Sequence, residues 1–169
     1  MHGREAIRAA LEETKSLLLW FLADFSESDM FVRPHPNANH AAWQVGNVIV
    51  GDIFILKEEY PNASFPELPP RFRELHGTET PLEGFPMQDG PEGFLPKAEM
   101  LSLFQTVRTA TLATLKGLTD QDLDRPTQGS MAGFAPTLGH LLILISNHTL
   151  MHGGQIQVIR RVLGKPHLF

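Results

Sequence analysis

The stretch TLGHLLILISNHTLMHGGQIQVIRRVL, residues 137–163, is a long apolar segment near the end of the chain. Apolar residues fall on nearly every face of a helix drawn through it, which predicts a helix buried among other helices. The segment also carries two histidines, His148 and His152, four residues apart. On an α-helix such a pair shares one face, with Cβ atoms roughly 5–6 Å apart, so both imidazoles can reach one metal ion.

Three further segments place apolar residues at three- and four-residue steps, at about residues 4–25, 40–59 and 97–116. Asn39 is the expected N-cap of the second helix, and Gly117 is expected to end the third. A short capped turn is predicted at residues 119–123. No alternating strand pattern of useful length occurs. We therefore expect an all-α fold, a four-helix bundle that forms a single domain over residues 1–169.

Residues 60–96 separate the second and third helices and have a different composition. This segment holds eight of the 13 prolines of the chain together with four glycines, and it follows neither a helical nor a strand period. It predicts a long Pro/Gly-rich crossover that joins two parallel helices. A crossover of this length either wraps the surface or forms a rim over a pocket, and the two interpretations are compatible.

Charge and composition exclude several classes of function. The net charge of −5, with no Lys/Arg run longer than two residues, argues against nucleic acid or an anionic membrane as the main partner. The absence of cysteine excludes disulfides, zinc–thiolate sites and a cysteine nucleophile. Uninterrupted apolar runs such as residues 141–145 are far too short to span a bilayer. The first residues do not form a signal peptide, so a cytoplasmic location is expected by default.

The histidine pair has two interpretations at this stage. A buried imidazole without a partner costs on the order of 1–3 kcal/mol, so each ring must bind something. Each could form hydrogen bonds with a backbone carbonyl or a neighbouring side chain, or both could bind a divalent metal. Two ligands are too few for an ordinary zinc site, so a third would have to come from another helix.

Several motifs together resemble one family. The segment NHAAWQVGNVIVGD, residues 39–52, resembles the second-helix motif of the DinB-like superfamily. The sequence LGH at 138–140, the pattern HxxxHGGQI at 148–156, Arg160 and the GKP at 164–166 resemble the last helix of that family, and the turn LTDQDL at 118–123 fits as well. The resemblance implies a four-helix bundle, often dimeric, in which three histidines hold a divalent metal such as zinc or nickel.

Carried over position by position, the resemblance makes His148 and His152 two of the three metal ligands and places the third at Asn47. An asparagine oxygen is a weaker, neutral ligand that suits hard cations better than zinc or nickel, or it could bind a metal-bound water. His40 lies seven residues before Asn47, roughly 10 Å along the helix axis, and is expected at the pocket rim or at the helix cap. Gln155 is expected to orient a ring or the chain and is a candidate cofactor-binding residue, with a packing amide as the alternative.

Asp52 matches a position where members of the family often carry a carboxylate. It is a candidate general base or a partner of a ligand, although a carboxylate on the helix surface is the favoured alternative. Three other histidines lie in polar or terminal stretches and are expected to be solvated: His35, His76 and His167. The glycine pair Gly153–Gly154 predicts close approach by another backbone, from the bundle or from a second subunit.

The resemblance implies a metal-dependent hydrolase or a thiol S-transferase that acts on a small-molecule substrate, with a low-molecular-weight thiol as a possible cofactor. The metal would activate a thiol or a water nucleophile. The alternative is a metal-free small-molecule-binding or stress-associated interaction protein that retains the bundle without catalysis. Asn47 favours this alternative, and the histidine pair favours the enzyme. A homodimer is expected in either case.

Overall fold

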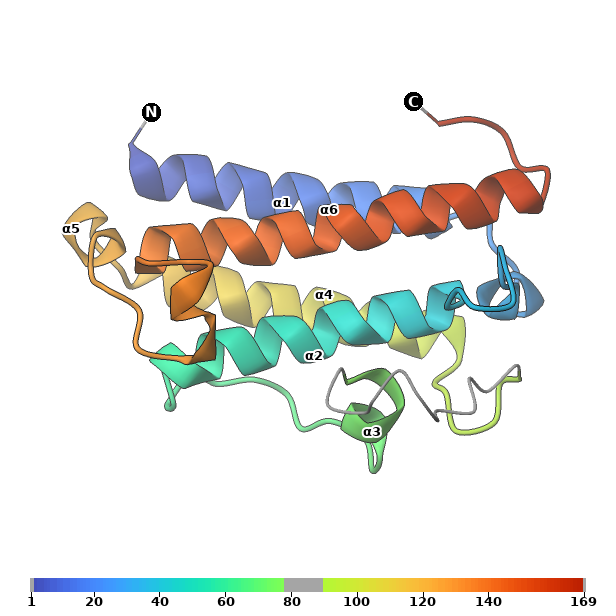
Figure 1. The fold of residues 1–169 in the computed structure, drawn as a ribbon, viewed down its shortest axis with the longest axis horizontal. Coiled ribbons are helices and arrows are strands. Elements are labelled where there is room, and N and C mark those ends of the chain that lie inside the picture. Colours follow the sequence, from blue (N-terminus) through green and yellow to red (C-terminus); the bar gives the residue numbers. More distant parts are fainter. Residues whose placement is uncertain (1, 78–89, 169) are drawn as a thin grey trace.

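The computed structural model describes residues 2–77 and 90–168. Its four long helices are α1 Gly3–Leu22, α2 Ala41–Glu59, α4 Lys97–Lys116 and α6 Leu138–Val162 (Figure 1). The short helices are η1 Ser28–Phe31, α3 Phe72–His76, α5 Asp120–Leu123 and η2 Ser130–Gly133. In the described part of the chain the only β pairing is an isolated bridge between Pro126 and Thr137. The predicted all-α four-helix bundle is therefore confirmed.

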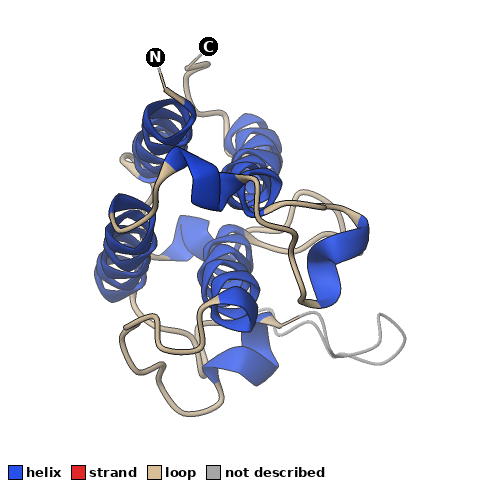
Figure 2. Cartoon of the chain, turned by 90° about the vertical axis from the view of Figure 1, so that its left-hand side faces the viewer, coloured by secondary structure: helices blue, strands red, loops and turns tan. Residues whose placement is uncertain are grey.

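The long helices pack around one elongated core. Helix α1 packs mainly against α6, and α2 packs against both α4 and α6. Helices α1 and α6 run in one direction, and α2 and α4 run in the opposite one (Figure 1). The view along the bundle shows the four helices enclosing the core (Figure 2). Because α2 and α4 are parallel, the chain must return along the whole bundle between them, which explains the long crossover.

The apolar core forms two clusters. One contains Phe21, Ile49 and Phe104, and the other contains Leu11, Leu56 and Leu142. Among the helices of the described residues, none has the length and apolarity needed to cross a membrane.

A buried ion pair lies inside the bundle. Arg108 on α4 places Nη2 3.0 Å from Asp52 Oδ2 on α2, and both side chains are completely buried. The same guanidinium donates to Thr149 Oγ1 on α6 at 2.5 Å and to the carbonyl of Leu11 on α1 at 3.4 Å. One side chain therefore contacts all four long helices. The expectation that Asp52 is a surface carboxylate is wrong, because its helix turns this position towards α4.

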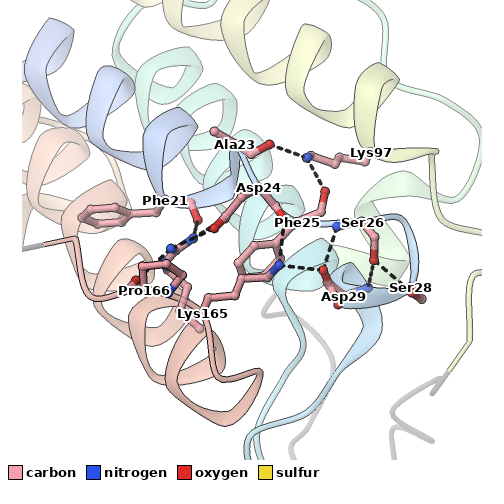
Figure 3. A network of polar contacts seen from close by, with 11 residues as sticks. Phe21, Ala23, Asp24, Phe25, Ser26, Ser28, Asp29, Lys97, Lys165 and Pro166 are labelled. Carbon is pink, nitrogen blue, oxygen red and sulfur yellow. Dashed lines mark hydrogen bonds and ion pairs between the residues drawn. The ribbon is translucent and has the colours of Figure 1, made fainter.

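The C-terminal end of α1 is closed by cations from distant parts of the chain (Figure 3). Arg160 on α6 donates to the carbonyl of Phe21 at 2.8 Å and pairs with the carboxylate of Asp24. Lys165 Nζ donates to the carbonyl of Asp24 at 2.7 Å. The last carbonyls of a helix lack partners within the helix and carry partial negative charge, so they favour such cations. Arg160 and Lys165 thus have structural roles.

Two helix ends and the crossover differ from the sequence-based expectation. His40, and not Asn39, caps α2, because its Nδ1 accepts from the amide of Trp43 at 3.1 Å. Helix α1 ends at Leu22, three residues earlier than expected. The crossover, expected to be irregular, contains the short helix α3.

The buried pair yields a prediction on stability. Asp52→Leu or Arg108→Leu alone leaves one charge buried without its partner, so each should lower the free energy of unfolding by about 3–5 kcal/mol. The double variant removes both charges and should regain most of that loss. Urea unfolding of the three variants and the wild type measures the coupling. Additive losses in the double variant would contradict the assignment.

Candidate functional site

The two histidines of α6 meet in the structure as their spacing predicts. Their Nε2 atoms lie 3.0 Å apart, and their rings are nearly perpendicular, with centroids 4.6 Å apart. His152 is 4% exposed, whereas His148 is half-buried. The two imidazoles therefore direct their Nε2 atoms towards one point. Solvent reaches this point past His148, the more exposed of the two rings.

A chain of hydrogen bonds fixes which nitrogen of His152 carries the proton. The side-chain nitrogen of Gln44, on α2, donates to the carbonyl of Asn39 at 3.2 Å. This contact turns the Gln44 oxygen towards Nδ1 of His152, and the two atoms form a short hydrogen bond. An amide oxygen only accepts, so Nδ1 of His152 must be the donor. In the neutral ring, Nε2 is then an unprotonated lone pair directed at His148.

Helix α2 makes room for His148 through a glycine. A Cβ atom built on Gly51 would lie 2.7 Å from Cε1 and 2.9 Å from Nδ1 of the His148 ring, so any larger residue at position 51 would displace the imidazole. Nδ1 of His148 is buried and has no hydrogen-bond partner among the described residues. Such an orphaned polar atom is uncommon in folded proteins and is often associated with a functional site.

Electrostatics keep both rings neutral near pH 7. Burial lowers the pKa of His152 to about 3, and the neighbouring His148 contributes to the shift. Burial also lowers the pKa of His148, with a further contribution from the positive charge of Arg108. Neutral imidazoles with free lone pairs are the form that binds metal ions.

Asn47 lies on the same face of α2 as the two residues that meet the histidines. Gln44 contacts His152 and Gly51 contacts His148, so the position between them, at i+3 and i−4, faces the pair. Asn47 is 5% exposed, and its side-chain nitrogen donates to the carbonyl of His76 at 2.6 Å. Its amide is therefore already engaged with the crossover.

The remaining predicted residues lie elsewhere. His40 caps α2 and packs its ring edge-on against Phe31 and Phe94. Gln155 is exposed on α6. Asp52 is paired with Arg108; burial raises the pKa of Asp52 to about 6, and Arg108 opposes this shift. The structure thus brings His148 and His152 together, whereas Asn47 binds the crossover, His40 packs on Phe31 and Phe94, Asp52 pairs with Arg108 and Gln155 is exposed.

Two functional-site neighbours were not anticipated from the sequence. Gln44 orients His152, and Trp43 places its ring 6.1 Å from that of His152. The only feature of the sequence that could have indicated Gln44 and Trp43 is that both lie in the helical turn just before Asn47. His76, expected to be solvated, is completely buried, because its ring fills the space left by Gly46, where a Cβ would lie 2.0 Å from Nδ1.

The donor set fits a metal ion only in part. Two zinc–nitrogen bonds of about 2.0–2.1 Å at a tetrahedral angle hold their nitrogens roughly 3.3–3.4 Å apart, close to the 3.0 Å between the two Nε2 atoms. However, no group of three or more His, Cys, Asp or Glu side chains within residues 2–77 and 90–168 is placed to hold an ion. The pair can supply two ligands, and position 47, where the resemblance implies a third histidine, is an asparagine.

The buried histidines predict a dependence of stability on pH. Burial lowers the pKa of His76 to about 4; the backbone of Trp43 partly opposes this shift, and His40 adds to it. For His76, His148 and His152 the unfolded chain binds protons more readily, so stability is full above pH ~6.5 and falls on acidification. Asp52 has a raised pKa, so between pH ~6 and 4 its protonation increases stability as the pH falls. This single group opposes three histidines, whose effect on stability is expected to dominate.

We therefore expect the free energy of unfolding to decrease from pH 6.5 to 4.5, as measured by urea titration at several pH values. His76→Leu should reduce this slope, because one proton-binding difference is removed. The exposed His140 on the same helix as the pair provides the control replacement. A slope unchanged in His76→Leu would contradict the burial of a neutral ring at this position.

Comparison with protein families supports the motif-based resemblance. A profile described as the DinB superfamily matches residues 10–156, which include the four long helices for most of their length and all residues of the histidine site. Comparison with curated proteins gives no match. The family match extends over well more than half of the chain and agrees with the observed bundle. The chain therefore belongs to the DinB superfamily.

Proposed function

We propose that this protein acts on a small molecule at a site centred on His148 and His152, and that the pair binds a divalent transition metal such as zinc or nickel. The observation that carries the proposal is the convergence of two neutral Nε2 atoms at 3.0 Å, with the tautomer of one ring set by Gln44. Histidines that bind metals commonly donate their other ring nitrogen to an oxygen in this way.

Each residue has a distinct role in this proposal. His148 and His152 are the metal ligands, Gln44 holds His152 in the binding tautomer, and Gly51 provides the space for His148. A bound metal would supply Lewis acidity, lowering the pKa of a water or of a low-molecular-weight thiol. With only two protein ligands, more of the coordination sphere is left to solvent and substrate than in a three-histidine site. Hydrolysis or thiol transfer is the corresponding class of reaction.

Asn47 sets this protein apart from the three-histidine pattern. Its amide nitrogen is used by the carbonyl of His76, and a neutral amide oxygen is a poor zinc ligand. We therefore assign no metal bond to Asn47. The same observation favours the second candidate function, a metal-free small-molecule-binding protein in which the two histidines simply bind each other.

Metal binding by purified, chelator-treated protein separates the two candidates. We expect isothermal titration with Zn²⁺ or Ni²⁺ to give one site per chain in the wild type. His152→Ala should abolish it, and Gln44→Ala should weaken it about 10-fold or more, because the ring loses its orienting partner. His140→Ala, an exposed histidine of the same helix, is the control. A wild type that binds no metal would favour the metal-free function.

Asn47→His tests the register of the site. Because position 47 faces the pair, a third imidazole should tighten metal binding at least 10-fold, even though the contact with His76 is lost. Tightening in this variant together with no binding in the wild type would mean that the site is vestigial. Unchanged affinity would mean that position 47 does not face the ion.

We further propose that the protein forms a homodimer through α6. Its exposed apolar side chains recur at seven- and eight-residue steps along one face, with a last step of four residues: Ile143, Leu150, Met151, Val158 and Val162. Gly154 lies on this face with nothing within 4 Å of an added Cβ, whereas Gly153 contacts Phe21 of α1. Light scattering should give twice the chain mass for the wild type and one chain mass for Leu150→Glu. A monomeric wild type at micromolar concentration would contradict the proposal.

A further inference from the structure

The crossover and α2 line a cavity of about 510 Å³ that is partly open to solvent. Ile53 and Lys57 line it from α2, and Phe65, Leu68, Phe72 and Arg73 line it from the crossover. Ile53 and Lys57 follow Gly46 by seven and eleven residues, so they share the helix face that meets His76. The histidine pair meets α2 through Gln44 and Gly51, on a different face. The cavity is thus separate from the proposed metal site.

The crossover wall of this cavity is held in place by buried contacts. Asn47 donates to the carbonyl of His76 at 2.6 Å, and the His76 ring fits against the bare backbone of Gly46. Phe72, one turn earlier in α3, is 3% exposed and packs its ring 4.3 Å from that of His76. The wall therefore does not depend on a ligand to keep its position, and the cavity is preformed.

The lining combines an apolar floor with a cationic rim. Ile53 and Phe72 are buried, whereas Lys57 and Arg73 are exposed. Arg71 and Glu74 neutralise each other at 3.0 Å. Lys57 and Arg73 form no ion pair with any described residue, and Glu67 is the one remaining acidic residue of the lining. The lining therefore keeps a net charge of +1 next to its apolar floor.

The backbone at the rim is also unusual. Arg71 has a φ of 62°, and it is the only non-glycine residue with positive φ in the described part of the chain. A non-glycine residue in this region is uncommon, and strained backbone of this kind clusters at functional sites. Here it starts α3 and sets the direction of the segment that carries Phe72 and Arg73.

We propose that this cavity binds an amphipathic organic anion, namely a monocarboxylate with an alkyl or aryl body. The volume lies within the usual range for small-ligand sites, which are mostly apolar with a few polar groups that fix orientation. The body of the ligand packs on Phe65 and Leu68, which line the cavity and are half-buried. Its carboxylate binds Lys57 and Arg73, the two cations without an acidic partner.

The probe is octanoate, titrated calorimetrically into the whole chain. Propionate tests the carboxylate without the alkyl body, and octyltrimethylammonium tests the alkyl body with the opposite charge. We expect measurable binding of octanoate and at least fivefold weaker binding of the other two. Lys57→Gln and Arg73→Gln should each weaken octanoate binding at least threefold, and Leu68→Trp should weaken it by narrowing the cavity. Arg161→Gln, an exposed cation on α6, should have no effect.

Equal binding of octanoate and octyltrimethylammonium would overturn the proposal, because the rim charge would then be irrelevant. Absence of octanoate binding to the wild type would overturn it as well. Loss of octanoate binding in the His148→Ala/His152→Ala double variant would place the anion at the histidine pair instead. Circular dichroism of each variant establishes that it is folded, and Leu68→Phe is the milder replacement if Leu68→Trp does not fold.

Discussion

The rest of the bundle depends on the ion pair and the hydrogen bonds that the guanidinium of Arg108 forms. It is completely buried, and it contacts Asp52 on α2, Thr149 on α6 and the backbone of Leu11 on α1. Apolar side chains pack well in several registers, but a buried charge tolerates only the arrangement that supplies its partners. The pair therefore selects the register of the four helices. Asp52 and Thr149 directly follow Gly51 and His148, so the same contacts set the level at which α2 meets the histidine pair.

Helix α2 contacts different parts of the chain on its different faces, and glycines make two of these contacts possible. Gly51 admits the ring of His148 from α6, and Gly46 admits the ring of His76 from the crossover. Between them Asn47 faces the histidine pair while its amide binds the crossover. A histidine at position 47 would serve the metal site, whereas the asparagine serves the crossover. In this chain the side-chain nitrogen of Asn47 docks the crossover, which forms one wall of the cavity.

Much of the fold could be predicted from the sequence. Helices of this length are recognised by the spacing of their apolar residues, by the prolines that flank them and by their capping residues. The limits of α4 and the pairing of His148 with His152 are of this kind, since both depend on local geometry alone. The burial of Asp52, His76 and Arg108 could not be predicted in the same way. Their partners lie 29 to 97 residues away along the chain, as in the contacts Asn47–His76 and Arg108–Leu11, so no local sequence pattern indicates them. Gln44 is an intermediate case, because its position beside the second-helix motif was visible but its partner on α6 was not.

Imidazole ¹⁵N NMR tests most directly whether the two Nε2 atoms of the histidine pair bind a metal ion, as we propose. In metal-free protein, His152 should show a protonated Nδ1 and an unprotonated Nε2, as its bond with Gln44 requires. Titration with Zn²⁺ should shift the Nε2 resonances of both His148 and His152 to metal-bound values, with the proton of His148 moving to Nδ1. Shifts confined to exposed histidines such as His140, with the pair unchanged, would contradict the account.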